Sequence, residues 1–334
     1  MLNNYNKTTR RENIRCVRRL IMYNMGIKHE IGKKIKNMDP RMYEGISHAF
    51  SYVRYYKRKN TKVDKIPNEL EKRYKKITGD HLNITNPKSY SEKIQWLKLY
   101  DDNDLRTTLT DKVLVRDWIK EKIGEEYLIP VLGVYNHFDE IDFSTLPDKF
   151  VIKTNHSSGW NIIVEDKSKL DLKKARKKIE SWLKLDYAYW SEYEIHYSPI
   201  KPKIIIEKFI TDSKGELNDF KFLCFGGECK FMWMDFDRVT NHKRNVYDMN
   251  WNLQPWNQYT YGNYEGNVEK PDKFDEMCKI ANTLCKGFRH VRVDLYNVDG
   301  KIYFGEMTFT NGSGMEGIYP KEYDYKLGDL INIK

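Results

Sequence analysis

The sequence predicts an α+β protein, and three observations point to this class. Strand-like runs follow one another as hairpins, most clearly in residues 290–309. Amphipathic patterns typical of helices occupy separate stretches, such as residues 172–185. The chain also lacks the regular alternation of strand and helix that builds a parallel α/β sheet.

Length and composition favour a folded protein with several subdomains. The chain has 334 residues, of which 40% are hydrophobic, and this is enough for a sizeable core. No apolar run approaches the roughly 18 residues of a membrane span, and the N-terminus is too charged for a signal peptide. The five cysteines form no C-x-x-C pair, so we expect neither a zinc site nor a disulfide framework. These features together lead us to expect a cytoplasmic protein.

Positive charge is concentrated in residues 1–80, which carry 21 Lys and Arg against 8 Asp and Glu. We interpret this segment as a basic, mainly helical N-terminal extension. It could contact an anionic membrane surface, nucleic acid or an acidic polymer, or it could be a solvated helical face. Basic and aromatic residues are interleaved in residues 52–62 and could stack bases, but no nucleic-acid-binding signature accompanies them. Nucleic acid is therefore not expected as a partner.

Two helices are predicted after the extension. Ser89 and Glu92 have the spacing of a capping box, which predicts a helix that runs to Tyr100. The next helix is predicted to begin at Thr110, with Lys112 in its first turn. The helix dipole disfavours a cation at that end, so Lys112 either reaches a ligand or is simply solvated.

A loop of small polar residues follows between two strand-like runs. Lys153 closes the first run, and the loop contains His156, Ser157, Ser158 and Gly159. Small residues let backbone N–H groups approach an anion closely, and the lysine adds positive charge. The pattern suits a phosphate-binding loop, although an ordinary hairpin turn is the alternative and the chain contains no Walker A motif.

Two further strands carry charged residues that need partners. Three consecutive isoleucines (204–206) predict a strand buried on both faces, and Glu207 at its end must reach water or a hydrogen-bond donor. Asp219 and Lys221 then share one face of the next strand.

Asp235 and Asp237 end another apolar run and form a D-x-D pair. Many sugar-nucleotide transferases hold a metal-bound diphosphate with such a pair, so a glycosyltransferase is an alternative interpretation. Against it, no β-α-β nucleotide-binding half precedes the motif. The residues that follow, 239–272, are turn-rich and aromatic and could line an open substrate cleft or cover a core.

The hairpin of residues 290–309 carries the candidate metal site. Residues 297–300 predict a type I turn with a three-residue loop, and this register places Arg292 opposite Glu306. Asp294 then becomes a diagonal neighbour of Glu306, about 7–8 Å away at the backbone. Two carboxylates at this spacing can converge on magnesium. An ordinary surface hairpin with an Arg–Glu pair is the alternative.

Four features follow one another along the chain. They are a lysine at a helix start, a strand lysine with a loop of small residues, a buried strand that ends in an acid, and a hairpin with two carboxylates. The set and its order resemble the ATP-grasp superfamily. The chain more closely resembles its TupA-like branch, which takes part in teichuronopeptide biosynthesis. The matching segments are residues 86–88, 92–98, 110–112, 152–156, 219–222, 292–296 and 305–308. The resemblance implies a clamp of two lobes with antiparallel sheets that holds ATP between them. It divides the chain into the extension (1–80), an ATP-grasp N-terminal subdomain (81–147), a central lid subdomain (148–206) and a C-terminal grasp subdomain (207–334).

The resemblance also implies roles for individual residues. The ATP phosphates would be held by Lys112 and Lys153, beneath a loop of His156, Ser157, Ser158 and Gly159. Further nucleotide contacts would come from Glu207, Lys208, Phe209, Ile210 and Asp219. Arg292 and Lys221 would be catalytic, while Asp294 and Glu306 would bind Mg²⁺. Many members of the superfamily have Glu-x-Asn where this chain has Thr308, so either Thr308 or Asn311 would complete the metal site.

The activity that the resemblance implies is ATP-dependent carboxylate–amine ligation through an acylphosphate, with ATP and Mg²⁺ as cofactors. The expected setting is capsular or cell-wall polysaccharide biosynthesis, where an amino acid or amine would be joined to a uronic acid or similar carboxylate on a saccharide. Residues 1–80 would then contact an anionic membrane or a lipid-linked glycan at the inner face of the membrane. A glycosyltransferase that uses Asp235 and Asp237 and a sugar kinase are the competing interpretations.

Overall fold

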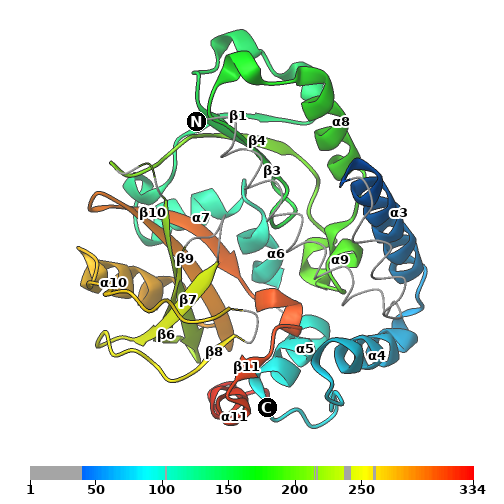
Figure 1. The fold of residues 1–334 in the computed structure, drawn as a ribbon, viewed down its shortest axis with the longest axis vertical. Helices are drawn as coiled ribbons and strands as arrows, with labels where there is room; N and C mark the ends of the chain where they lie inside the picture. Colours follow the sequence, from blue (N-terminus) through cyan, green and yellow to red (C-terminus); the bar gives the residue numbers. More distant parts are fainter. Residues whose placement is uncertain (1–39, 102–103, 214, 216, 237–241, 259–260) are drawn as a thin grey trace.

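Two main antiparallel sheets, one in each lobe, form the framework of the protein (Figure 1). The computed structural model describes residues 40–334 except 102–103, 214, 216, 237–241 and 259–260, and it describes side chains from His48 onward. Helices α6 (Asp104–Thr110) and α7 (Val115–Lys122) lie between the two sheets. This architecture of helices and antiparallel sheets confirms the predicted α+β class.

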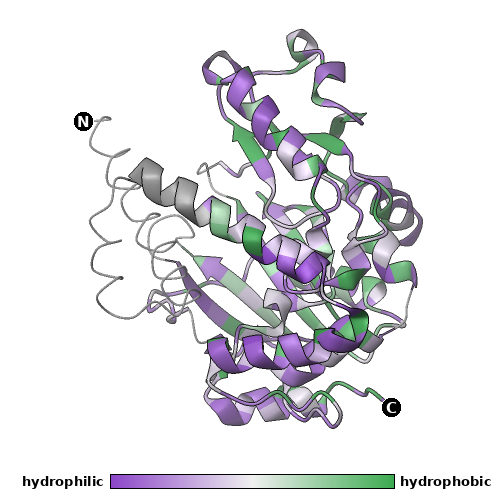
Figure 2. Ribbon diagram, turned by 90° about the vertical axis from the view of Figure 1, so that its right-hand side faces the viewer, coloured by the Kyte–Doolittle hydropathy of each residue, from purple (hydrophilic) through white to green (hydrophobic). Residues whose placement is uncertain are grey.

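The first sheet has four strands in the order β1–β4–β2–β3. Their bounds are β1 Val131–Tyr135, β2 Phe150–Thr154, β3 Asn161–Val164 and β4 Ile204–Lys208. Helix α8 (Leu172–Leu183) packs Ala175 and Ile179 against one face, and its outer surface is largely hydrophilic (Figure 2). Residues 204–206 are fully buried, as predicted for a strand covered on both faces. Because β1 pairs with β4, this sheet also crosses the subdomain boundary expected at residue 147.

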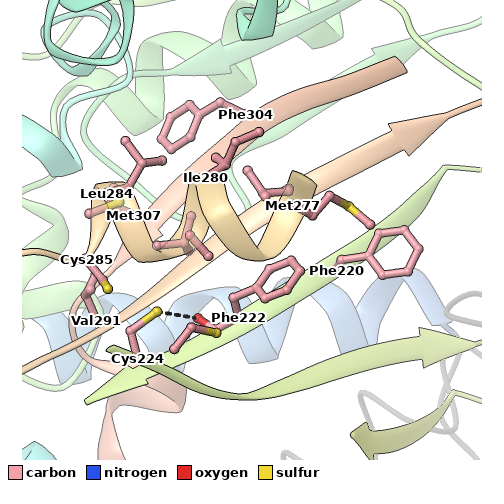
Figure 3. Close-up of a cluster of buried hydrophobic side chains, with 14 of the residues drawn as sticks. Phe220, Phe222, Cys224, Met277, Ile280, Leu284, Cys285, Val291, Phe304 and Met307 are labelled. Carbon is pink, nitrogen blue, oxygen red and sulfur yellow. Dashed lines mark hydrogen bonds between the residues drawn. The ribbon is translucent and has the colours of Figure 1, made fainter. Parts of the chain in front are cut away.

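The second sheet has five strands in the order β10–β9–β5–β6–β7. Their bounds are β5 Asn218–Phe225, β6 Glu228–Phe236, β7 Lys243–Asp248, β9 His290–Val298 and β10 Lys301–Thr308. Helix α10 (Phe274–Leu284) covers its apolar face, and Figure 3 shows Met277, Ile280 and Leu284 directed at the strands. Cys285 is fully buried in the same core. Strand β7 lies within the stretch 239–272, which was predicted to be turn-rich.

Strands β9 and β10 pair in a register that differs from the predicted one. Val298 pairs with Lys301, so the loop contains only Asp299 and Gly300, whose φ angles are both positive, at 49° and 82°. Asp-Gly in a two-residue loop is the signature of a type I′ turn, whose twist matches that of the strands. The predicted three-residue loop is therefore wrong.

A β-bulge at Gly305 changes the register a second time. Phe304 follows the register of the turn, whereas Glu306, beyond the bulge, pairs directly with Asp294. The two carboxylates are thus opposite each other and not diagonal. Because side chains alternate between faces, Glu306 would share the apolar face of Phe304 if Gly305 were paired regularly with Asp294 and did not form a bulge. The bulge lets β10 bury Phe304 and Met307 on one face and still present Glu306 on the other.

Helix α5 (Tyr90–Tyr100) covers part of the other face of the second sheet together with α11 (Lys321–Asp329). The start of α5 is as predicted: the Ser89 hydroxyl accepts from the Glu92 N–H, and the Glu92 carboxylate accepts from the Ser89 N–H. The helix predicted from Thr110 is wrong. Helix α6 ends at Thr110 and α7 begins at Val115, so Lys112 lies in the turn between them.

Short elements complete the fold. The small strands β8 (Asn257–Gln258) and β11 (Ile318–Tyr319) pair with each other. Single 3₁₀ turns are η1 Val63–Lys65, η2 Glu125–Tyr127, η3 Phe138–Glu140, η4 Phe143–Thr145, η5 Lys167–Lys169, η6 Ile195–Tyr197 and η7 Asn311–Gly314. Among the described helices, none has the length and apolar character that a membrane crossing needs.

The described part of the basic extension consists of α3 (Pro40–Lys59) and α4 (Ile66–Thr78), and α3 packs against α9 (Tyr187–Trp190). Tyr55 is only 2% exposed and lies 6.4 Å from Trp190, ring centre to ring centre. Arg58 donates to the backbone carbonyl of Trp190 at 2.8 Å. These contacts leave Tyr55 and Arg58 unable to stack on bases. Residues 1–39, which carry much of the positive charge, lie outside the described part of the chain.

Candidate active site

A cavity between the two sheets brings together residues that are far apart in the sequence. Lys153 and Glu207 come from the first sheet, Glu306 comes from the second, and Lys112 comes from the turn between α6 and α7. The full set of lining residues is Leu109, Thr110, Lys112, Val115, Arg116, Lys153, Glu207, Phe304, Gly305 and Glu306. Four residues predicted to bind ATP and Mg²⁺ therefore share one cavity.

On the first sheet, Lys153 and Glu207 lie on the face that looks into this cavity. They are diagonal neighbours on β2 and β4, and the Lys153 ammonium lies 2.5 Å from the Glu207 carboxylate. Arg116 of α7 approaches the other carboxylate oxygen of Glu207 at 3.6 Å. The prediction missed Arg116, although its place four residues after Lys112, in a segment predicted to be helical, is a signal for a shared face.

Lys112 is tied to the loop after β2 at two points. Its backbone N–H donates to the carbonyl of Asn155 at 3.2 Å, and its ammonium donates to the carbonyl of Ser157. Burial lowers the pKa of Lys112, and the nearby Glu306 carboxylate opposes this shift in part. The lysine therefore bonds to the base of the loop and shares the cavity with the Glu306 carboxylate of the second sheet.

The loop itself has a buried half and an exposed tip. His156 is 2% exposed, and its Nε2 lies 3.2 Å from the carbonyl oxygen of Leu185. Burial lowers the pKa of His156. Ser157 is also buried and shares a hydrogen bond with Thr154, whereas Ser158 and Gly159 are exposed. Any movement over a ligand would therefore fall to the tip, and a phosphate contact by His156 stays a prediction.

The residues expected at the adenine edge follow Glu207 along β4 and beyond it. The Lys208 N–H donates to the carbonyl of Pro130 at 2.9 Å, and its side chain is exposed. Phe209 and Ile210 are half-buried, and the Lys149 ammonium lies 5.9 Å from the centre of the Phe209 ring. Their role toward a base stays a prediction.

The second sheet presents a row of alternating charges on the face toward the cavity. Lys221 of β5 pairs across the sheet with Asp294 of β9, and their charged groups are 3.0 Å apart. The Lys221 ammonium also contacts the Asp219 carboxylate. All three side chains are less than 10% exposed. The prediction that Asp219 and Lys221 share a face is confirmed, and the two form a buried ion pair.

Arg292 stands at the centre of the predicted metal ligands. Its guanidinium binds both oxygens of Asp294 at 2.6 and 2.7 Å and one oxygen of Glu306 at 3.0 Å. It also donates to the side-chain oxygen of Asn311. Burial opposes the charge on Arg292, but the attraction of Asp294 and Glu306 outweighs it and raises the pKa above its ordinary value. Burial would likewise raise the pKa of Asp294, but Arg292 and Lys221 hold it below its usual range.

The oxygen atoms around Arg292 fit a hard cation. Asp294, Glu306 and Asn311 all direct oxygens at one positive group, and Mg²⁺ prefers one or two carboxylates completed by phosphate oxygens and water. Thr308 donates to Glu306 at 2.8 Å, so its hydroxyl supports the carboxylate. No cluster of three or more acidic, histidine or cysteine side chains able to hold a metal occurs in the described residues. The donors that this place offers are the carboxylates of Asp294 and Glu306, of which Asp294 has both oxygens bound by Arg292 and one also by Lys221. A metal at this place stays a prediction.

Asp235, the first acid of the D-x-D pair, is buried in an ion pair with Arg244. The two groups meet at 2.6 and 2.9 Å, and Arg244 lies between the rings of Trp233 and Tyr261. Burial would raise the pKa of Asp235, but His242 and Arg244 hold it far below its usual range. Both oxygens of Asp235 are therefore committed to structural partners. Asp237 lies outside the described residues.

A charged cavity between two antiparallel sheets is the architecture of the ATP-grasp enzymes, a class of ATP-dependent ligases. The chain belongs to the TupA-like ATP-grasp family, since the sequence model of that family matches residues 92–332. The resemblance noted in the sequence is thereby confirmed. No curated protein matches the chain.

Several solved ligases resemble the chain at low identity. D-alanine–D-alanine ligase from Bacillus anthracis, complexed with ATP, has 14% identity and a TM-score of 0.38, with 66% of this chain and 68% of that chain covered. The corresponding ligase from Helicobacter pylori has 12% identity and a TM-score of 0.38 over 72% and 69%. Biotin carboxylase from Campylobacter jejuni has 12% identity and a TM-score of 0.39 over 68% and 47%. The chain spans 66% of another Bacillus anthracis ligase structure and about half of the carboxylase, and the identification rests on the family match.

Proposed function

We propose that the protein is a carboxylate–amine ligase that uses ATP and Mg²⁺ to form an amide. One observation carries this proposal: Lys112, Lys153, Glu207 and Glu306, from four separate segments, line a single cavity between the two sheets. Membership of an ATP-grasp family supports the same chemistry. Three cationic side chains (Lys112, Arg116 and Lys153) and two carboxylates line this cavity, and they suit a triphosphate with a bound metal better than a neutral ligand.

In the proposed reaction, an oxygen of the acceptor carboxylate attacks the γ-phosphorus of ATP, and the bond to the β–γ bridging oxygen breaks to release ADP. The amine then attacks the acyl carbon of the acylphosphate, and phosphate leaves as the amide forms. A magnesium ion held by Asp294 and Glu306 would supply charge neutralisation at the phosphates when bound.

The chain's own residues would position and neutralise the reactants. Lys112 and Lys153, with Arg116 beside them, offset the negative charge that spreads over the phosphoryl oxygens. Arg292 and Lys221 lie next to the carboxylates that would hold the metal, and we assign them to the transferred phosphoryl group. The exposed tip at Ser158 and Gly159 would exclude water from the acylphosphate.

For the substrates, we propose a carboxylate on a saccharide, such as a uronic acid, and an amino acid or other amine. The support is the membership of the TupA-like branch, whose resemblance points to capsular or cell-wall polysaccharide biosynthesis. A glycosyltransferase that relies on Asp235 is the weaker candidate, because the family match is to ATP-grasp enzymes and Asp235 is not among the residues that line the cavity.

The proposal predicts that purified protein releases ADP from Mg·ATP only when a carboxylate and an amine are both present. The measurement is ADP release over a panel of uronic acids and amino acids, with each class also supplied alone. Intact ATP across the whole panel would contradict a ligase. A stable phosphoester that accumulates without any amine would indicate a sugar kinase in its place.

We further propose that the extension contacts an anionic membrane surface through the outer side of α3. Phe50, Val53 and Tyr56 repeat every three residues and are 45%, 64% and 56% exposed, so they form an apolar stripe on one side of the helix. Lys57 is 70% exposed beside them. Lys57 forms an ion pair with Glu69 at 2.8 Å. An exposed apolar stripe beside an exposed lysine suits the headgroup region of anionic lipids. In Figure 2 this helix crosses the front of the molecule.

The full chain is therefore expected to float with vesicles of anionic phosphatidylglycerol, and to lose this binding when Phe50 and Val53 are both replaced by serine. A matched control is Leu172→Ser on α8, an equally exposed apolar side chain at 45% that should leave binding unchanged. Flotation should weaken as salt rises. Equal binding by the double variant, or no binding by the full chain at low salt, would refute this contact.

A further inference from the structure

Lys98, in the last turn of α5, is a buried amine whose hydrogen bonds go to uncharged oxygens. It is 4% exposed, and its ammonium donates to the carbonyls of Glu192 and Ser313, both at 2.8 Å, and to the Ser313 hydroxyl at 3.0 Å. Burial lowers the pKa of Lys98 to about 8, although Glu194 and Glu192 oppose the shift. Because burying an ammonium is costly, its three acceptors must hold it in place.

The two segments that Lys98 joins both have left-handed backbone conformations. Glu192 and Tyr193 have φ angles of 62° and 66°, and Gly312 and Ser313 have φ angles of 52° and 54°. A non-glycine residue in this conformation is strained and persists only where its surroundings hold it. The Lys98 ammonium therefore bonds to two strained turns that are 121 residues apart in the chain, from 192 to 313. The Ser313 hydroxyl, which accepts from Lys98, also donates to the Ser191 carbonyl at 3.0 Å and joins the same two turns.

The turn at residues 311–314 leads from Lys98 to the charged row of the second sheet. Ser313 receives a further hydrogen bond from Gln95, whose side-chain amide donates to the Ser313 carbonyl at 2.9 Å. Two residues earlier, Asn311 accepts from the guanidinium of Arg292. A shift of this turn would move the Asn311 oxygen away from Arg292, which itself holds Asp294 and Glu306.

We propose that Lys98 is a positioning residue, which fixes the turn at 311–314 so that Asn311 holds Arg292 in the arrangement used for phosphoryl transfer. Lys98 contacts no reacting group in this scheme and acts through the turn. The inference rests on the proposed function at one point, the assignment of Arg292 to the transferred phosphoryl group.

The chain offers a matched control on the same helix. Lys93 also donates to two backbone carbonyls, those of Gly328 at 2.8 Å and Ile331 at 2.9 Å, but these belong to the C-terminal helix and the residues after it. Lys93→Met and Lys98→Met each remove an ammonium that donates to two backbone carbonyls, although Lys93 is half-buried and Lys98 is buried. Only the second loosens a turn that reaches Arg292.

The test compares kcat and the KM for ATP in the wild-type protein, Lys98→Met, Lys93→Met, Asn311→Ala and the double variant Lys98→Met/Asn311→Ala. We expect kcat to fall roughly 10- to 100-fold in Lys98→Met, with the KM for ATP within about twofold of wild type, because a displaced turn misplaces the reacting groups. Lys93→Met should keep kcat within about twofold even where its thermal stability falls equally. The double variant should be no slower than the slower single variant, since both changes break one chain of contacts.

Multiplicative losses in the double variant, or equal losses of kcat in Lys93→Met and Lys98→Met, would overturn the proposal. If Lys98→Met does not fold, Ser313→Ala removes one of the three bonds of Lys98, together with the bond from the Ser313 hydroxyl to the Ser191 carbonyl, and should give a smaller loss of kcat in the same direction. Amide hydrogen exchange at residues 311–314 provides a readout that needs no turnover. Suppose that the wild-type protein leaves ATP intact but Lys98→Met still shows faster exchange at residues 311–314. The proposed function would then be wrong, while the role of Lys98 in fixing the turn would stand.

Discussion

Replacing Glu306 by glutamine is expected to lower ATP turnover roughly 100- to 1000-fold, because the change removes one of two carboxylates that would hold the metal on the phosphates. Glu306 has a side chain 34% exposed on the cavity wall, and its carboxylate accepts from Arg292 and Thr308. Glutamine keeps the shape and one acceptor oxygen, so the fold should survive. The measurement is ADP release as a function of magnesium concentration, and the variant should need more magnesium.

Glu276→Gln is the control for this prediction. Glu276 has a similarly exposed side chain, 38%, and accepts from Tyr127 at 2.9 Å, but it lies on α10 against the opposite face of the sheet. Its loss should leave the rate and the magnesium requirement within about twofold. A Glu306→Gln variant with unchanged magnesium dependence would remove Glu306 from the metal site.

Replacing Arg244 by methionine is expected to lower the free energy of unfolding by about 3–5 kcal/mol, the cost of leaving a buried charge without its partner. The charge left behind is Asp235, which is 6% exposed and receives two bonds from Arg244. Denaturant unfolding measures the effect. Arg289→Met should cost under about 1 kcal/mol, because the Arg289–Asp101 pair is long, at 3.5 Å, and partly exposed, and the bonds from Arg289 to the carbonyls of Asn332 and Lys334 are exposed to solvent.

The same residues discriminate between the two proposed activities. If Asp235 is structural, Asp235→Asn should reduce stability while the folded fraction keeps its affinity for Mg·ATP. If Asp235 instead binds a metal and a nucleoside diphosphate sugar, the same change should abolish sugar-nucleotide binding with little loss of stability. Binding of a sugar nucleotide in preference to ATP by the wild-type protein would reverse our assignment.

Local signals predicted the elements that depend on neighbouring residues. The capping box at Ser89 and Glu92 set the start of α5, because both hydrogen bonds form within four residues. Three isoleucines predicted β4, because a strand without polar side chains must be covered on both faces. The order of lysines and acids predicted the residues that share the cavity, although that inference needed a family resemblance as well as pattern.

The register of β9 and β10 was missed even though the sequence carries its signals. Asp299-Gly300 is a two-residue turn signature. The apolar positions Ile302 and Phe304 are even-numbered, whereas Met307 and Phe309 are odd-numbered, and this change of parity at Gly305 marks a bulge. The prediction still placed Asp294 and Glu306 on one face. The shorter turn shifts the register by one residue, and the bulge shifts it by one more in the same direction. A total shift of two residues returns each side chain to its predicted face.

Other features depend on contacts that no local pattern reveals. Strand β7 contains Arg244 and Asn245, which read as polar turn residues until Asp235 and the backbone of Tyr264 supply their buried partners. Lys98 looks like an ordinary basic residue near a helix C-terminus, where it would be favourable in solvent. Its burial follows only when residues 192 and 313 fold against it.

The contacts of Glu192 decide how much of the chain forms one cooperative unit. Its carboxylate forms ion pairs with Arg58 of α3 and, at 3.1 Å, with Arg73 of α4. Its backbone carbonyl accepts a hydrogen bond from Lys98. The family match begins at residue 92, after both helices. A chain begun at residue 80 would keep every residue of the match and yet leave Glu192 without either guanidinium, with the aromatic surface around Trp190 uncovered. Such a truncation would therefore probe the integrity of the fold itself, and not only the role of the basic extension.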